Sequence, residues 1–132
     1  MKNGFSLHKE RKQILMIQAI STPTWPDYEL IDSGGFEKLE RFGRFITARP
    51  EPQAVWQKSL SEEIWRKKAD AYFEKGKGNS QEDRGTWHLK KGVPDIWEMK
   101  FDGQQFRLKF KIALTSFKHV GIFPEQADNW NW

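Results

Sequence analysis

The stretch that decides the fold runs from Ile96 to Gln126 and begins IWEMKFDGQQFRLKFKIAL. Large apolar and charged side chains alternate on both sides of Asp102-Gly103, which is typical of two strands joined by a tight turn. Asp-Gly tolerates the positive φ that a type I′ turn requires at both central positions, so we predict a two-residue hairpin loop.

A two-residue loop also fixes which residues of the two strands face each other. The predicted pairs on the apolar face are Phe101 with Gln104, Met99 with Phe106 and Trp97 with Leu108. On the opposite face Glu98 meets Arg107, which is a favourable cross-strand pair.

Before the hairpin, short strand-like runs alternate with turn residues, which predicts a meander. Turns are expected at Asp32-Ser33-Gly34-Gly35 and at Gly43, and the meander ends at Pro50 and Pro52. The predicted strands lie at 16–20, 28–31, 37–42, 44–49, 71–74 and 86–89.

One helix is predicted between the meander and the strand at 71–74. Ser59-Leu60-Ser61-Glu62 has the form of a capping box, in which Ser59 accepts from the backbone N–H of Glu62. The helix is expected to continue to about Lys68, and a polar, Gly-containing loop covers 76–84. The fold class is therefore α+β, mainly an antiparallel sheet with about six to eight strands and one or two short helices.

Composition limits the classes of protein to consider. The chain has 132 residues, enough for one domain, and its seven Trp and ten Phe exclude a disordered chain. It has no cysteine, which excludes disulfides and thiolate chemistry within the chain and fits a cytoplasmic protein.

No apolar run approaches the roughly 18 residues of a membrane span, so no membrane partner is expected. Residues 1–15 are basic and are expected to be a mobile extension.

The candidate ligand-binding residues are few. His8, His88 and His119 lie far apart without a metal-binding spacing, so no metal site is predicted. The net charge of +4 permits contact with nucleic acid without implying it.

Three arginines form a candidate nucleic-acid surface. Arg41, Arg44 and Arg49 interleave with Phe42 and Phe45, and basic and aromatic residues on a sheet can hold phosphates and stack bases. The alternative, in which the two phenylalanines are core and the arginines form a solvated face, is favoured.

The segment Phe117–Gln126 is untypical of a plain strand or helix, because it mixes Lys, His, Gly, Phe, Pro, Glu and Gln within ten residues. With this segment, the sequence resembles the N-terminal part of a bacterial class I S-adenosylmethionine-dependent methyltransferase family. That family is related to the ribosomal RNA large-subunit cytosine-5 methyltransferases. The resemblance rests on residues 27–35, 37–43, 49–56 and 117–126.

The resemblance implies a role for the last of these segments. In related enzymes a segment of this kind leads from the accessory domain into the catalytic domain and lies near the cofactor. The residues expected to line that edge of the S-adenosylmethionine site are Lys118, Gly121, Phe123 and Gln126. Lys118 would hold an anion, and Gly121 would allow close backbone approach.

The resemblance also implies a division of the chain, with an accessory domain at 16–116 and a lead-in segment at 117–132. The family's Rossmann-like catalytic domain would begin where this chain ends, and its cytosine-5 relatives use a cysteine that is absent here. We therefore expect an accessory domain that presents substrate, most simply RNA in rRNA processing, to its own downstream methyltransferase domain. The chain alone is expected to bind no cofactor and to lack activity.

The tail from about Phe117 is expected to be poorly anchored without the catalytic domain, because its apolar residues need a partner. The alternative function is a stand-alone nucleic-acid-binding or protein-interaction module without catalysis.

Overall fold

The computed structural model describes residues 24–78 and 83–131. The predictions for residues 1–15 and for a strand at 16–20 lie outside these ranges. The elements within them are β1 (Tyr28–Gly34), β2 (Glu37–Phe42), β3 (Phe45–Pro50), α1 (Glu62–Lys68), β4 (Ala71–Lys75), β5 (Gly85–Leu89), β6 (Ile96–Asp102), β7 (Arg107–Ala113), and the 3-10 turns η1 (Pro124–Gln126) and η2 (Asn129–Asn131). The predicted α+β class with a mainly antiparallel sheet is confirmed.

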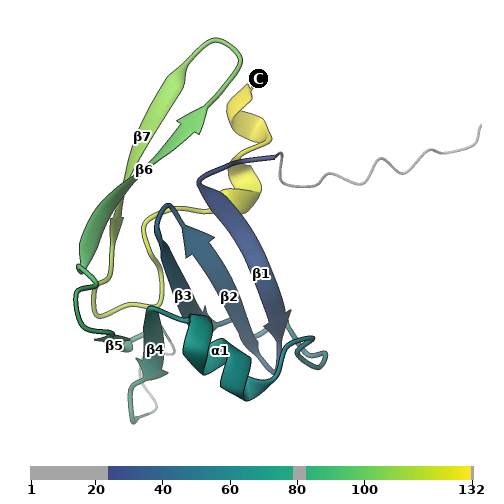
Figure 1. Cartoon of the computed structure of the whole chain (residues 1–132), viewed down its shortest axis with the longest axis vertical. Helices are drawn as coiled ribbons and strands as arrows, with labels where there is room; N and C mark the ends of the chain where they lie inside the picture. The colour runs from purple at the N-terminus through teal and green to yellow at the C-terminus, as the bar shows by residue number, and fades with distance from the viewer. Residues whose placement is uncertain (1–23, 79–82, 132) are drawn as a thin grey trace, which may run out of the picture.

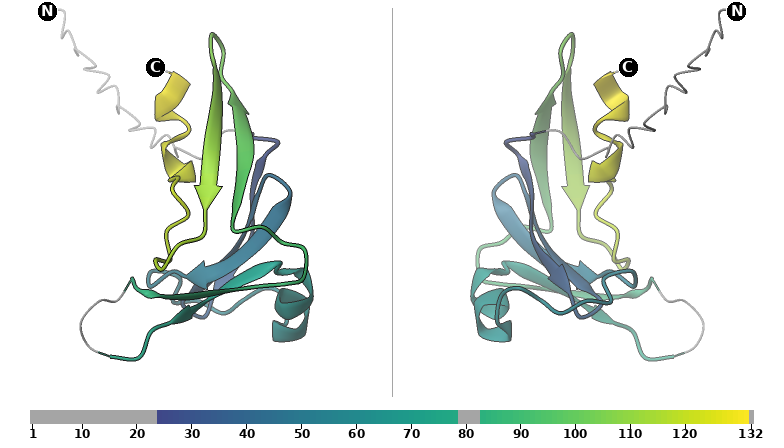
Figure 2. Two further views of the ribbon diagram at one scale, coloured as in Figure 1. Left: turned by 90° about the vertical axis from the view of Figure 1, so that its left-hand side faces the viewer. Right: turned by 90° about the vertical axis from the view of Figure 1, so that its right-hand side faces the viewer.

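The strands form two sheets (Figure 1). The meander β1-β2-β3 is as predicted, and β4 and β5 extend it to a five-stranded sheet in chain order. β4 runs parallel to β3, with Thr47 opposite Ala71, because the connection that carries α1 crosses over one face of the sheet. β6 and β7 form a separate antiparallel hairpin, which rises away from β4 and β5 (Figure 2).

The two faces of the five-stranded sheet pack against different partners. On the helix face, Leu39 and Ala48 pack against Trp65 and Ala69 at α1. On the hairpin face, a larger core joins the sheet to the hairpin and the C-terminal segment. Its buried residues are Trp25, Phe42, Ala71, Phe73, Trp87, Trp97, Met99, Phe101, Ile112, Val120, Ile122 and Ala127.

The turn between β1 and β2 lies slightly later than predicted, because β1 continues through Gly34. Gly34 has a φ of 147°, and a Cβ atom there would lie 2.5 Å from the backbone nitrogen of Lys58. Only glycine therefore fits where the loop before α1 crosses the end of β1.

Helix α1 has a different cap from the one predicted. The N-cap is Ser61, whose side chain accepts a hydrogen bond from the N–H of Ile64 at 3.3 Å. Glu62 binds the Nζ of Lys58 at 2.8 Å instead of the backbone of Ser59. The predicted capping box is therefore wrong by two residues, although the predicted end at Lys68 is correct.

The hairpin β6–β7 forms as predicted, but its register is different. Trp97 faces Ile112 rather than Leu108, and Glu98 faces Lys111 rather than Arg107. Residues 103–106 form the loop, and Gly103 does not adopt the positive φ of a type I′ turn. The register moves by four residues, an even number, so each side chain keeps the face that its alternation predicted.

The C-terminal tail is anchored, contrary to our expectation. Val120 and Ile122 are buried, and Trp130 packs edge-on against Trp25 and Phe101. Figure 2 shows this segment running beside the hairpin in both views. Ile122 and Trp130, which were expected to need a second domain, find their partners within this one, whereas Phe123 stays exposed.

Candidate functional site

The segment Phe117–Gln126 forms one wall of a charged hollow of about 180 Å³ on the hairpin face of the sheet. β2, β3 and the loop after β3 form the other wall. The lining residues are Lys38, Arg49, Pro50, Glu51, Pro52, Lys118, His119, Phe123 and Glu125.

A buried ion pair lies beneath this hollow. The Nε and Nη2 atoms of Arg49 bind the two carboxylate oxygens of Glu40 at 2.7 and 3.3 Å. The side chains are 7% and 1% exposed, respectively. The hydroxyl of Tyr28 donates to Glu40 at 3.0 Å. Burial, together with the adjacent Glu40 carboxylate, raises the pKa of Tyr28 far above its ordinary value, so the phenol stays protonated.

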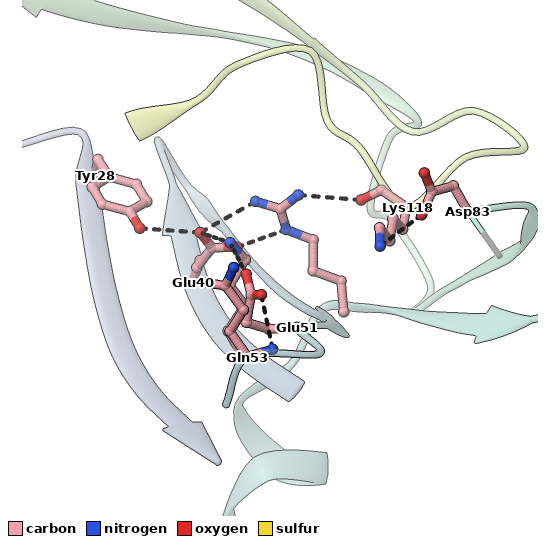
Figure 3. A network of polar contacts seen from close by, with 8 residues as sticks. Tyr28, Glu40, Glu51, Gln53, Asp83 and Lys118 are labelled. Atoms are coloured by element: carbon pink, nitrogen blue, oxygen red, sulfur yellow. Dashed lines mark hydrogen bonds and ion pairs between the residues drawn. The ribbon is translucent and has the colours of Figure 1, made fainter. Parts of the chain in front are cut away.

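Arg49 and Asp83 connect the candidate segment to the rest of the fold (Figure 3). The Nη1 atom of Arg49 donates to the carbonyl oxygen of Lys118 at 3.3 Å. The Nζ of Lys118 binds Asp83 at 2.6 Å, and its backbone N–H donates to the Asp83 carbonyl at 3.0 Å. The hydrogen bond from Lys118 lowers the pKa of the Asp83 carboxyl. Trp87 adds a third attachment by donating its Nε1–H to the carbonyl of Phe117 at 2.9 Å.

A third ion pair lies at the mouth of the hollow. The Nζ of Lys38 binds Glu51 at 3.0 Å and lies 3.7 Å from Glu40. Burial opposes ionisation of Glu51, but the hydrogen bond and charge of Lys38 outweigh it, so the pKa of Glu51 is lowered.

The three cations of the hollow are therefore each matched by a carboxylate. Lys38 pairs with Glu51, Arg49 with Glu40 and Lys118 with Asp83. A bound anion would have to compete with these pairs, so the hollow by itself is a polar contact surface rather than a phosphate site. Within residues 24–78 and 83–131, no group of three or more His, Asp or Glu side chains is placed to hold a metal ion.

The structure separates the four residues predicted for the cofactor edge. Lys118 and Phe123 line the hollow, and Phe123 is 56% exposed. Gly121 has a φ of 92°, which favours glycine, and Gln126 accepts a hydrogen bond from the side-chain amide of Asn129 at 2.9 Å. Neither Gly121 nor Gln126 is among the lining residues.

The three arginines predicted for nucleic acid do not share one surface. Arg41 pairs with Ile46 across β2 and β3, whereas Arg49 pairs with Lys38, so alternation places the two arginines on opposite faces of the sheet. Arg49 is buried in its ion pair, and its guanidinium is not available to a phosphate. Arg41 is half-buried and donates to the carbonyls of Gly43 and Pro26, while Arg44 is exposed in the turn after β2.

Sequence analysis did not single out Lys38, Glu40 or Glu51 as members of the site. The alternation in β2 already places Lys38 and Glu40 on one face. Their meeting with Arg49 depends on the register between β2 and β3, in which Lys38 faces Arg49. The Pro-Glu-Pro run at residues 50–52 was a signal for a constrained loop at this point.

The fold and the hollow define an α+β domain with an antiparallel meander, a projecting hairpin and a charged contact surface. No protein-family model matches the sequence, and no curated protein matches it. Among solved structures it is similar to the crystal structure of the SAM-dependent methyltransferase from Agrobacterium tumefaciens, with a TM-score of 0.67 and 36% sequence identity. The match covers 80% of this chain and 31% of that chain, so this chain corresponds to under a third of that methyltransferase.

The similarity therefore relates this domain to one part of a SAM-dependent methyltransferase. None of the helices that the structure describes is both long and apolar enough to cross a membrane.

Proposed function

We propose that this chain is the substrate-presenting accessory domain of a S-adenosylmethionine-dependent methyltransferase that acts on RNA. The observation that carries the proposal is the 36% identity to a SAM-dependent methyltransferase, of which the match covers only 31%. Class I methyl transfer takes place on a doubly wound, mainly parallel sheet. The sheets described here are a meander and a hairpin, so the reaction centre belongs to another part of the parent protein.

The candidate edge toward the catalytic domain is the segment from Lys118 to Gln126. Its backbone is attached through Arg49, Asp83 and Trp87, so its exposed side chains start from fixed positions. Phe123 offers an exposed ring for contact with the cofactor or the catalytic domain, and Lys118 lies at the rim of the hollow in its ion pair with Asp83. Gly121 and Gln126 act at the same edge through backbone conformation and hydrogen bonding.

For the RNA part of the proposal, Arg44 provides an exposed cation in the turn after β2, and the half-buried Arg41 lies at the end of β2. Exposed arginines contact phosphates without a sequence requirement. Arg49 is left out of this surface because it is buried.

The proposal is tested first in the coding sequence that follows Trp132. We expect an in-frame strand followed by a Gly-rich loop that opens a helix. A stop codon directly after Trp132 would instead support a stand-alone module.

The cofactor edge is tested in the protein extended through that downstream domain. Phe123→Ala is expected to weaken S-adenosylmethionine binding by about tenfold, because an aromatic contact contributes about 1 kcal/mol or more. Phe36→Ala is the matched control, since Phe36 is 59% exposed and Phe123 is 56% exposed. Equal dissociation constants for the wild type and Phe123→Ala would remove this residue from the edge.

A further inference from the structure

A second surface lies on the helix face of the sheet, where α1 ends and β4 and β5 are left uncovered. Tyr72 faces Ala48 across the strands, which places it on the face that α1 covers further along. Its ring stacks on that of His88, with centroids 4.7 Å apart and planes at 16°, and it remains 53% exposed. The Nε2 of His88 is held by Glu74 at 2.6 Å, so the imidazole backs one face of the Tyr72 ring, and this stacked pair is the platform.

A hollow of about 440 Å³ lies beside this platform. Among its lining residues, Tyr72 and Leu89 are exposed apolar residues. The lining residues are Arg66, Ala69, Asp70, Tyr72, His88, Leu89 and Lys90. A single nucleobase is small enough for this space, and its two flat faces suit an aromatic ring on an open sheet.

The rim of the hollow is basic. The last turn of α1 contributes Arg66 to the lining, and Lys90 follows the end of β5. Lys67, Lys68 and Lys91 are their neighbours in sequence. Lys90 is fixed in place, because its Nζ donates to the carbonyls of Arg66 and Lys67 at 3.0 and 2.8 Å.

The two carboxylates beside this rim are already engaged. Asp70 accepts from the N–H of Ile46 at 2.8 Å, and Glu74 binds His88. Of the residues that line the hollow, Arg66 and Lys90 are cations and Asp70 is the one carboxylate, so the rim favours a phosphate.

We propose that this hollow binds one unpaired base of a single-stranded RNA. The hollow and the stacked rings beside it are together called the base platform. The base stacks on Tyr72, and its flanking phosphates lie toward Arg66 and Lys90. This inference rests on the RNA substrate of the proposed function and assigns that substrate a surface. Arg41 lies on the same face of the sheet, two strands away from β4.

The test uses the complete 132-residue chain and a fluorescein-labelled single-stranded RNA of about ten nucleotides, within the usual range of site sizes. Fluorescence anisotropy at about 50 mM salt gives the dissociation constant, because phosphate contacts are strongest at low salt. Tyr72→Leu is expected to weaken binding by about tenfold, the effect of losing one stacked base. Phe36→Leu removes an equally exposed ring elsewhere and is expected to bind as the wild type does.

A second pair of variants tests the cationic rim. Arg66→Gln is expected to reduce the magnitude of the slope of log K against log salt by about one. The control is Arg107→Gln on the hairpin, where the side chain is 89% exposed, and it is expected to leave the slope unchanged. Amide NMR shifts on the wild-type chain give a readout that does not depend on how a variant folds. RNA is expected to shift Tyr72, His88 and Leu89 most strongly.

RNA binding that Tyr72→Leu does not weaken, or that Phe36→Leu weakens equally, would overturn the base platform while leaving the RNA substrate intact. No RNA binding at all would overturn the platform and leave this face to a protein partner. Neither result affects the methyltransferase assignment, which depends on S-adenosylmethionine binding by the extended protein.

Discussion

At the scale of single residues, the Glu40–Arg49 pair joins the sheet to the C-terminal segment. Glu40→Ala leaves the guanidinium of Arg49 buried without its carboxylate and removes the acceptor of the Tyr28 hydroxyl. Breaking a buried pair from one side costs about 3–5 kcal/mol. We expect a loss of that size in urea unfolding, whereas Glu98→Ala on the exposed side of β6 should change stability by less than about 0.5 kcal/mol. Equal losses would mean that the pair does not stabilise the fold.

Asp32 is a second buried residue with a measurable signature. A β-bulge between Leu30 and Asp32 precedes its carboxylate. That carboxylate accepts hydrogen bonds from the backbone N–H groups of Ser33, Ser59 and Leu60 and from the Nε1–H of Trp65. Burial opposes its charge, but the four donors outweigh burial, so the pKa of Asp32 is lowered in the folded state.

The lowered pKa predicts how stability depends on pH. The folded state binds a proton on Asp32 less readily than the unfolded state does. The ionised carboxylate therefore stabilises the fold fully above the unfolded pKa of about 4, and this stabilisation is lost as the pH falls toward the lower folded pKa. Asp32→Asn is expected to cost about 2 kcal/mol at neutral pH and to flatten the acid limb of the stability curve. Urea unfolding between about pH 2 and pH 7 measures this. Parallel curves for wild type and variant would contradict it.

At the scale of elements, the helix cap gives a prediction with a built-in control. Ser61 accepts from the N–H of Ile64, whereas Ser59 contributes its backbone N–H to Asp32. Ser61→Ala is expected to lower the free energy of unfolding by about 1 kcal/mol. Ser59→Ala should have little effect, and thermal unfolding of both variants measures the difference. The reverse order would restore the capping box that begins at Ser59.

The hairpin loop shows how a correct pattern can produce a wrong register. A Cβ atom at Gly103 would lie 2.6 Å from the ring of Phe106, so Gly103→Val is expected to destabilise by about 1 kcal/mol through this contact. If this contact is the cause, adding Gly103→Val to the Phe106→Leu variant should cost less stability than adding it to the wild type. A cost that is the same in both backgrounds would instead indicate backbone strain at position 103.

These elements also show what the sequence could predict. Alternation in β2, β6 and β7 gave the correct faces because side-chain direction is a local property of a strand. The hairpin register, the helix cap and the meeting of Lys38, Glu40 and Arg49 depended on loop geometry and on pairing between strands. Local patterns do not determine such pairings, since Asp102-Gly103 and Ser59-Leu60-Ser61-Glu62 each fit more than one structure.

At the scale of the whole molecule, the C-terminal segment was misjudged because its partners are distant in sequence. Trp130 packs against Trp25, Phe101 and Phe110, which come from the start of the described chain and from both hairpin strands. The segment is thus part of this domain's own core. Its exposed residues, Phe123 above all, remain available at the surface for a second domain.

We propose that this domain serves a cofactor site that it does not itself contain. Calorimetric titration of S-adenosylmethionine into the 132-residue chain, and into the protein extended through its downstream domain, tests this most directly. A class I site takes most of its contacts from the strand ends and first helix of a Rossmann sheet. We therefore expect no binding heat from the short chain and a saturable signal from the extended one. Micromolar binding by the short chain, or none by the extended protein, would contradict it.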